Sequence, residues 1–349
     1  MFRSFVVGLG RSGAGLHLPV LRRTAGLPNA RQLLGTEPPL VFDPRGLPGG
    51  EPRGPLTGVT ATRSLAEAAA LAQTDRTVVH VCTPPTARVG VLAELGRLGF
   101  RNVLVEKPLA LDERGLAELE LVRARCGLEL VVVAPWLAST LTQRLSQAVA
   151  GGELGALRSV SFVQRKPRFG RSLAGNGHPT AFDIELPHSV GVALALAGAA
   201  RVRHARSEDM RLGEVLLPRL GGAHLWLDHE SGVRTRIRSD LQAPGRERRV
   251  VVHFEHGTLI GHYPNSDADD YAQLRTVVGR QQRRIVFLDD SLQAFILAAY
   301  RHFASPGPLA DNLAVNVEVV RLLDAAKRMS APHPPLARAL GQKVGQGVR

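Results

Sequence analysis

The sequence predicts an α/β protein with two domains: an N-terminal doubly wound parallel sheet, followed by an α+β domain with a large open antiparallel sheet. Three observations support this prediction. Short apolar runs alternate with helical patterns over residues 1–135, a glycine-rich turn follows the first run, and strand-like alternation begins near Ala156. A chain of 349 residues is also longer than one hydrophobic core usually serves.

The first 135 residues form a series of strand and helix patterns. The predicted strands are apolar throughout, as is typical of strands covered on both faces; they are Phe5–Gly8, Leu40–Asp43, Val78–Thr83, Val103–Glu106 and Leu130–Ala134. The helical patterns between them are Gly13–Arg23, Leu65–Ala72, Thr86–Leu98 and Asp112–Arg125. Strands that alternate with helices pair in parallel, so this part is expected to form a parallel sheet with helices on both faces.

A glycine-rich turn joins the first predicted strand to the first helix. Gly8, Gly10 and Gly13 are spaced as G-x-G-x-x-G, and Arg11 and Ser12 lie between them. In such a unit the first glycine permits a tight turn, the second lets a pyrophosphate approach the backbone, and the third lets helix and strand pack closely. The free N–H groups at the helix start then face the phosphates. The motif predicts a Rossmann domain that binds a dinucleotide through these five residues.

Asp43 ends the second predicted strand, 30 residues past Gly13. A carboxylate at this place can accept hydrogen bonds from both ribose hydroxyls of an adenosine and would repel a 2′-phosphate. The spacing exceeds the usual ~20 residues because the linking segment is extended. Arg45, two residues further on, could accommodate a phosphate. NAD is therefore the expected cofactor, with NADP possible.

Two further turns follow predicted strands at the edge where open α/β sheets bind ligands. They are Cys82-Thr83-Pro84 and Glu106-Lys107-Pro108, and both are expected to border the cofactor. Lys107 is the only lysine in the first 135 residues, in a chain with four lysines and 40 arginines. A compact, titratable charge is therefore expected to serve a purpose at that position.

Four features of the sequence together resemble the motifs of one family. They are the G-x-G-x-x-G start, the T-P-P turn, the Glu106-Lys107-Pro108 sequence and a later segment with acidic residues and a histidine. This family is the glucose–fructose oxidoreductase, inositol dehydrogenase and rhizopine-catabolism (Gfo/Idh/MocA) family of NAD(P)-dependent oxidoreductases, and the resemblance in layout covers roughly residues 1–330. It implies that Lys107 contacts the substrate hydroxyl near the nicotinamide. It also implies a cis peptide before Pro108.

The resemblance further implies an aspartate and a histidine at i and i+4 on a helix of the second domain. Here Asp183 lies five residues before His188, and Glu185 lies three before it. Either Asp183 keeps the family role with one residue absorbed in a turn, or Glu185 replaces it from the same helix face. Pro187 fits if the helix begins near it, because proline is tolerated in the first turn. His188 is the expected base.

The pattern changes after residue 155. Consecutive alternating runs predict an antiparallel sheet with one exposed face; they are residues 156–166, 201–207, 223–230, 233–241 and 248–256. Residues 182–198 predict a buried helix, and Leu292–His302 and Asn312–Arg328 predict two more. The expected division is residues 1–135 for the Rossmann domain, 136–330 for substrate binding and oligomerisation, and 331–349 for a C-terminal tail.

Composition narrows the function classes. The formal net charge of +13 invites a nucleic-acid partner, but the dense basic patches are short and lack interleaved aromatic residues, so none is expected. No apolar run approaches the ~20 residues that cross a bilayer, and a cytoplasmic protein without a membrane contact is expected. Cys82 and Cys126 cannot make a disulfide framework and show no metal-site spacing, so no metal is expected.

The residues together predict an NAD-dependent dehydrogenase that transfers a hydride between the nicotinamide and a secondary alcohol. Lys107 would stabilise the alkoxide, His188 would take the proton, and Asp183 or Glu185 would orient the imidazole. Polar side chains precede His188 in the Gly170–Pro179 loop or near it, and they suit a polyhydroxylated ring with or without amino or phosphate substituents: Arg168, Arg171, Asn176 and His178. A cyclic polyol such as an inositol, a sugar or an aminocyclitol is the expected substrate.

The resemblance implies carbohydrate catabolism or the biosynthesis of sugar-derived antibiotics, and a homodimer or homotetramer formed through the C-terminal sheet. A cofactor-binding regulator without turnover, built on the same scaffold, is the alternative. The retention of Lys107 and His188 argues against it, whereas the irregular spacing of Asp183 argues weakly for it. An enzyme that transfers hydride between two sugars through a tightly held cofactor is a third option.

Overall fold

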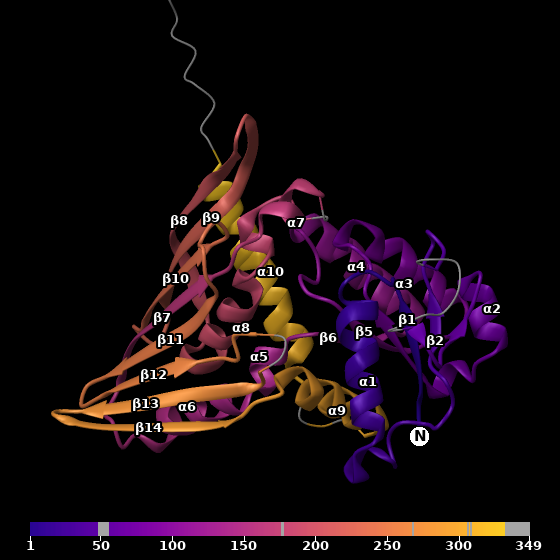
Figure 1. Ribbon diagram of the computed structural model, residues 1–349, viewed down its shortest axis with the longest axis horizontal. Coiled ribbons are helices and arrows are strands. Elements are labelled where there is room, and N and C mark those ends of the chain that lie inside the picture. The colour runs from indigo at the N-terminus through magenta and orange to yellow at the C-terminus, as the bar shows by residue number, and fades with distance from the viewer. Residues whose placement is uncertain (48–55, 176–177, 267–268, 306, 308, 332–349) are drawn as a thin grey trace, which may run out of the picture.

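The computed structural model describes residues 1–47, 56–175, 178–266, 269–305, 307 and 309–331. Two β-sheets form its frame, and helices lie between them (Figure 1). The predicted tail from 332 onward, Asn176 and residues 48–55 lie outside the described residues.

The first sheet has six parallel strands in the order β3-β2-β1-β4-β5-β6. The strands are β1 Arg3–Val7, β2 Leu40–Phe42, β3 Thr60–Ala61, β4 Thr77–Val81, β5 Asn102–Val105 and β6 Glu129–Val132. The order reverses between β1 and β4, which is the point where doubly wound sheets bind ligands at the carboxyl ends of their strands. The fold prediction for this part is confirmed, and all five predicted strands are present within two residues at each end.

Alternate side chains of this sheet enter two different cores, as strand geometry requires. Phe5 and Val79 pack on one face with helices α3 and α4, whereas Val6 and Val78 pack on the other with α1 and α9. All five residues of β4 are buried. Because both faces are covered, the strands can be apolar throughout.

The helices of this part are η1 Gly13–His17, α1 Leu18–Ala25, η2 Pro28–Ala30, α2 Leu65–Ala70, η4 Thr74–Arg76, η5 Pro85–Ala87, α3 Arg88–Arg97 and α4 Glu113–Cys126. Each of the four helical patterns predicted for this part is matched by a helix, with one local difference, and two short helices, η2 and η4, lie outside those patterns. Asp112 caps α4 by accepting a hydrogen bond from the backbone N–H of Gly115 at 2.8 Å. The helix predicted from Gly13 begins with a π-helical turn, in which the His17 N–H donates to the Ser12 carbonyl at 2.8 Å.

Two helices that the sequence analysis did not predict, α5 Pro135–Ala138 and α6 Thr140–Gly151, lead into an eight-stranded sheet of order β14-β13-β12-β11-β7-β10-β9-β8. Its strands are β7 Leu157–Arg165, β8 Ala200–Leu212, β9 Val215–His229, β10 Arg234–Asp240, β11 Glu247–Phe254, β12 Thr258–His262, β13 Tyr271–Val278 and β14 Gln281–Leu288. The last three were not predicted.

The antiparallel pairing predicted for this sheet is confirmed for every neighbouring pair except β7 and β10. These two strands run parallel, with Phe162 opposite Ile237. Some 70 residues separate them in the chain, and they include helices, so no tight hairpin forces the antiparallel direction.

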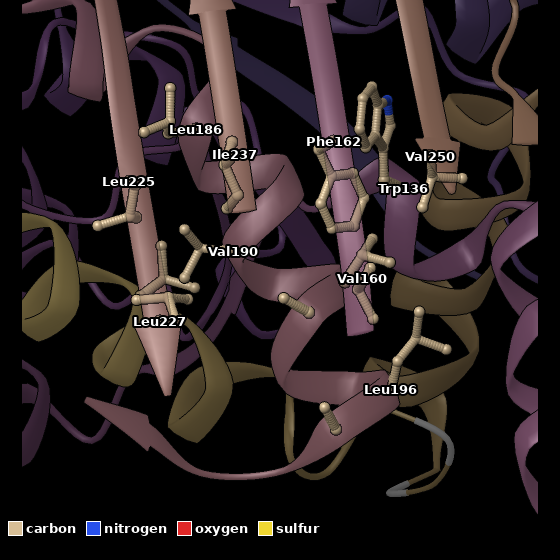
Figure 2. Close-up of a cluster of buried hydrophobic side chains, with 14 of the residues drawn as sticks. Trp136, Val160, Phe162, Leu186, Val190, Leu196, Leu225, Leu227, Ile237 and Val250 are labelled. Atoms are coloured by element: carbon tan, nitrogen blue, oxygen red, sulfur yellow. The ribbon is translucent and has the colours of Figure 1, made fainter. Parts of the chain in front are cut away.

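One face of this sheet packs against α8 Leu186–Ala197. Leu186, Val190 and Leu196 of α8 point toward the sheet residues Val160, Phe162, Leu225, Leu227, Ile237 and Val250 (Figure 2). On β10 the alternation is complete, because Thr235, Ile237 and Ser239 are buried while Arg234, Arg236 and Arg238 are exposed. The predicted buried helix with Pro187 in its first turn is confirmed.

The two C-terminal helices return to the first sheet. Phe295, Ile296 and Tyr300 of α9 Ser291–Ala304 join the core that covers β1 and β4. The Asn312 side chain, at the start of α10 Asn312–Met329, bonds the backbone N–H and carbonyl of Val132 in β6, at 2.7 and 3.1 Å. The last helices therefore hold the two sheets together, and the division predicted at residue 135 stays a prediction.

Among the described residues, no helix is both long and apolar enough to cross a membrane. The two remaining short helices, α7 Phe169–Leu173 and η6 Ala181–Asp183, lie in the connection between β7 and α8.

Candidate active site

The glycine-rich turn lies at the carboxyl end of β1, beside the reversal point of the first sheet. Gly8 has a φ of +93°, in the left-handed region that favours glycine. A Cβ on Gly13 would lie 1.9 Å from the Gly8 carbonyl oxygen, so no side chain fits there. A Cβ on Gly10, in contrast, would meet nothing within 4 Å. The turn is therefore closed toward the protein and open at Gly10.

This geometry fits a diphosphate. The backbone N–H groups of Gly10 and Ser12 find no acceptor within the part of the chain that the structure describes. Free backbone donors at the start of a helix form an anion site. The open space at Gly10 is where a phosphate would approach the backbone.

Asp43 follows β2 and is only 7% exposed. Its carboxylate accepts the Leu9 N–H at 2.7 Å, the Arg45 N–H at 2.9 Å and two guanidinium bonds from Arg45 at 3.1 Å. Although burial opposes its charge, the hydrogen bonds from Arg45 and Leu9 hold the pKa of Asp43 below its usual value. The side chain of Arg45 is 77% exposed. A guanidinium thus covers the carboxylate that was predicted to meet the ribose.

Glu106 ends a buried chain of hydrogen bonds that the sequence analysis missed. Its Oε1 accepts from His17 Nε2 at 3.0 Å, His17 Nδ1 meets His80 Nδ1 at 2.8 Å, and His80 Nε2 meets the Tyr300 hydroxyl at 2.9 Å. Tyr300 lies 2.6 Å from Ser4 Oγ. Both histidines and Tyr300 are fully buried.

The two Nδ1 atoms, 2.8 Å apart, share one proton, so one histidine donates and the other accepts. Burial opposes charge on His17, but neighbouring Cys82 and Glu106 raise its pKa to about 10. Burial and the charge of His17 lower the pKa of His80 well below its usual value. His17 is therefore an imidazolium that donates to both Glu106 and His80, and neutral His80 donates to Tyr300. Burial raises the pKa of Glu106, but the hydrogen bond and the charge of His17 outweigh burial and lower this pKa to about 2.

A buried guanidinium joins the other two turns. Arg88, only 2% exposed, donates to the carbonyls of Pro108, Leu109 and Thr83. It thereby ties the predicted Cys82-Thr83-Pro84 turn after β4 to the Glu106-Lys107-Pro108 turn after β5. The Lys107–Pro108 peptide is cis, as the resemblance implied.

Lys107 points from the first sheet toward the start of α8. Its Nζ donates to the Ile184 carbonyl at 2.6 Å, and its backbone N–H donates to Glu106 Oε2 at 3.1 Å. Burial lowers the pKa of Lys107, against the opposing carboxylates of Glu185 and Glu106. The side chain is partly buried, so a molecule at the edge of the sheet can reach it.

The two acidic candidates lie in different surroundings. Asp183 accepts from the Thr180 hydroxyl at 2.7 Å and pairs with Lys327 Nζ of α10 at 2.9 Å. Glu185 pairs with Lys166 after β7, and its carbonyl accepts from Gln164 at 3.2 Å. Among the described residues, neither carboxylate bonds the His188 ring. It is the charge of Glu185 that acts on His188, by raising its pKa.

His188 lies in the first turn of α8, and its ring stacks on Trp136 with centroids 5.4 Å apart. Trp136 stacks in turn on Tyr263 at 3.9 Å. Burial and the charge of Lys107 lower the pKa of His188 to about 3. The imidazole is therefore neutral near pH 7, and Lys107 is close enough to influence its charge.

The sequence analysis missed Lys166 and Lys327, although the signal that singled out Lys107 was available for both. The chain has four lysines, and these three each bond a residue in the segment 183–185. The buried Glu106–His17–His80–Tyr300 chain had no comparable signal. Its members come from four separate elements and meet only in the fold.

No protein-family model matches the chain, and no curated protein sequence is detectably similar to it. Solved structures are similar over nearly the whole chain. One is KijD10, a 3-ketoreductase from Actinomadura kijaniata in complex with TDP-benzene and NADP, with a TM-score of 0.73 and 17% identity over 94% of this chain and 98% of that one.

Two others come from different organisms. A protein from Desulfitobacterium hafniense provisionally named an NADPH-dependent oxidoreductase has a TM-score of 0.73 and 13% identity over 94% of this chain and 95% of that one. A protein from Sinorhizobium meliloti provisionally named a myo-inositol dehydrogenase has a TM-score of 0.69 and 18% identity over 94% of this chain and 97% of that one. The chain has the two-sheet fold of these structures, and the family resemblance of its motifs fits that fold.

Proposed function

We propose that this chain is an NAD(P)-dependent oxidoreductase that interconverts a secondary alcohol and a ketone on a cyclic polyol, sugar or aminocyclitol. The observation that carries the proposal is the meeting of Lys107, from the first sheet, with the segment that holds Glu185 and His188, in front of the second sheet. This meeting lies on the same sheet edge as the open glycine turn. Ligands bind at that edge in doubly wound sheets.

The chain offers a complete set of groups for a dinucleotide. Gly8, Gly10, Arg11, Ser12 and Gly13 would hold the diphosphate, and Asp43 with Arg45 would meet the adenosine ribose. The turns Cys82-Thr83-Pro84 and Glu106-Lys107-Pro108 would border the nicotinamide. When bound, this cofactor supplies the hydride acceptor or donor. The solved structure of KijD10 contains NADP, which supports the same cofactor class here.

Lys107 and His188 would handle the charge and the proton of the substrate. An ammonium at the Ile184 carbonyl can turn to a substrate oxygen and stabilise negative charge on it. The neutral imidazole of His188 can accept the hydroxyl proton near pH 7, and the imidazolium that results is favoured by the charge of Glu185. We assign Asp183 to the structure, because its carboxylate is bonded to Thr180 and Lys327.

The substrate class is supported by the names of the similar structures. One is a 3-ketoreductase and another is provisionally named a myo-inositol dehydrogenase. A role in carbohydrate catabolism or in the biosynthesis of a sugar-derived antibiotic is consistent with both.

The test has two stages. NADH and NADPH are first titrated into the protein while energy transfer from tryptophan to the reduced nicotinamide is followed. Inositols, aminocyclitols, hexoses and their keto forms are then screened with both cofactors. Lys107→Met should lower kcat about 100-fold or more, and His188→Asn about 100-fold. Arg114→Met, which removes an exposed cation of α4, should leave the rate unchanged.

A failure to bind either cofactor would remove the proposed function. Turnover that survives Lys107→Met unchanged would instead show that the assigned site is wrong. Cofactor binding without turnover of any compound in the screen would favour the alternative, a regulator that binds a dinucleotide. Reduced-nicotinamide absorbance in the purified protein would favour an enzyme that holds its cofactor tightly while it transfers hydride from one sugar to another.

We also propose that the chain forms a homodimer or homotetramer through the outer face of the eight-stranded sheet. Exposed residues alternate with buried ones along β10, and the exposed ones are Arg234, Arg236 and Arg238. Light scattering during gel filtration gives the mass directly. A monomer at micromolar concentration would contradict this proposal.

A further inference from the structure

The carboxylates of the candidate site are each paired with a cation. Glu106 bonds the His17 imidazolium, Glu185 pairs with Lys166, and Asp183 pairs with Lys327. All three acids are buried or nearly so, so these pairs are largely withdrawn from solvent. A buried ion pair is close to neutral as seen from a distance. The charge balance of the site therefore depends on the cations outside these pairs.

Arg168 is one such cation. It follows β7, at the start of the connection that leads to α7, and it is 7% exposed. Among the described residues, its guanidinium makes one long hydrogen bond, from Nη1 to Ser172 Oγ at 3.5 Å. Its Nε is buried and has no hydrogen-bond partner among the described residues. Within the same residues, no carboxylate forms an ion pair with it.

Further positive charge faces Arg168. Burial and the charges of Arg171 and Arg11 lower the pKa of the Arg168 guanidinium to about 10, while the charge of Glu185 opposes this lowering. The charge of Arg168 in turn lowers the pKa of Lys107. Cations from the glycine turn, from β5 and from the segment after β7 thus converge on one region. Like charges gathered under partial burial raise the free energy of the empty site.

His178 completes this region. Its Nδ1 is buried and has no hydrogen-bond partner among the described residues. Burial, followed by the charges of Lys107 and Arg168, lowers the pKa of His178 to about 3. A neutral imidazole in a positive field is expected to gain a proton or donate a hydrogen bond once an anion arrives. Two buried nitrogens, on Arg168 and His178, therefore have no hydrogen-bond partner in the part of the chain that the structure describes.

We propose that Arg168, with His178 beside it, binds an anionic group of the substrate, a phosphate or a carboxylate, while the reacting carbon lies at Lys107. The inference rests on the proposed function and narrows it from neutral polyols to sugar or cyclitol phosphates and acids. Guanidinium groups recognise both anions through paired hydrogen bonds. The diphosphate of the cofactor is the other source of such an anion, because Arg11 belongs to the glycine turn. Arg168 is assigned to the substrate because it follows β7 of the second sheet, whereas the turns assigned to the cofactor follow strands of the first sheet.

The experiment compares matched neutral and anionic probes on the protein saturated with NADPH or NADH. The pairs are myo-inositol with inositol 1-phosphate, and glucose with glucose 6-phosphate and with glucuronate. The variants are Arg168→Gln, Arg168→Lys, and the control Arg165→Gln, which removes a more exposed arginine of β7. Turnover is measured where it occurs. Inorganic phosphate and all five probes are also titrated calorimetrically, with and without cofactor.

The wild type should bind or turn over the anionic member at least about tenfold better than its neutral partner, because a charged hydrogen bond is worth roughly that factor or more. Arg168→Gln should raise KM or Kd for the anionic member about 10- to 100-fold, with kcat and the affinity for NADH nearly unchanged. Arg168→Lys should restore part of the loss, and Arg165→Gln should show none.

Equal use of neutral and anionic members, or no effect of Arg168→Gln on the anionic member, would overturn the inference and leave the proposed function standing. If Arg168→Gln weakened NADH binding as strongly as phosphate binding, the anion would belong to the cofactor and the inference would also fail. If the protein bound no dinucleotide, the proposed function would fail first. Calorimetry of phosphate without cofactor would then still decide whether Arg168 holds an anion.

Discussion

Replacing Gly13 by alanine tests the geometry of the glycine turn through folding stability. The new methyl carbon would lie 1.9 Å from the Gly8 carbonyl oxygen and 3.1 Å from Val6 Cγ1. The first contact involves backbone, so the turn must open by roughly 1 Å, an overpacking that costs about 1–3 kcal/mol. The opening also disturbs the Gly8 N–H bond to the Phe42 carbonyl and the Leu9 N–H bond to Asp43, of 2.8 and 2.7 Å.

Each of those hydrogen bonds contributes about 1 kcal/mol, so the total loss for Gly13→Ala is about 3 to 5 kcal/mol. We expect the unfolding temperature to fall by about 10 to 20 °C, given the size of the first unit. Circular dichroism at 222 nm during heating measures the shift.

Gly10→Ala is the matched control, because it adds the same methyl group three residues away. Its Cβ would meet nothing within 4 Å, and its φ lies outside the left-handed region. Stability should therefore be unchanged or slightly higher. The methyl group would occupy the space assigned to the diphosphate, so the affinity for NADH and NADPH should fall about tenfold or more. An unchanged unfolding temperature for Gly13→Ala, or full cofactor affinity for Gly10→Ala, would refute this account of the turn.

Three other predictions follow from single contacts. Lys327→Met leaves the carboxylate of Asp183 buried without its cation, and it should lower the free energy of unfolding in urea by about 3 kcal/mol; a loss below about 1 kcal/mol would contradict it. The pKa of His17 is raised from 6.5 to about 10, and that of Glu106 is lowered from 4.5 to about 2. Their ion pair therefore stabilises the fold fully between pH 4.5 and pH 6.5. The stabilisation declines as the pH rises toward 10 and as it falls toward 2. His17→Gln should flatten the alkaline decline in thermal unfolding followed from pH 6.5 upward, and a wild type of level stability there would disprove the pairing. Arg45→Ser should weaken NADPH binding about 10- to 100-fold and leave NADH binding within a factor of about two, because only the 2′-phosphate gains the guanidinium; equal losses for the two cofactors, measured by tryptophan energy transfer, would argue against this role.

The candidate site could be predicted only in part. Lys107 and Pro108 follow a strong strand pattern, so their place at the sheet edge was expected. The cis peptide between them was implied by the family resemblance. The choice between Asp183 and Glu185 was left open, because it depends on which lysine reaches which carboxylate. Lys166 comes from β7 and Lys327 from α10.

The second sheet shows a similar limit. Alternating runs predicted strands β7 to β11, since burial on one face leaves a period of two in the sequence. The parallel pairing of β7 with β10 is absent from either strand's own pattern, because a period of two is the same in both directions. Likewise, α9 was predicted as a helix, but its packing against the first sheet through Tyr300 was not.

By itself, the sequence determined the local features of this protein: the glycine turn, the apolar strands and the lysine that follows one of them. Each depends on residues close together in the chain, where spacing and side-chain type suffice. The tertiary structure alone decided which charges meet, including the buried Glu106–His17–His80 chain, and which nitrogens, on Arg168 and His178, have no partner among the described residues. Those contacts join elements far apart in sequence, and their energies depend on burial, which no local pattern specifies.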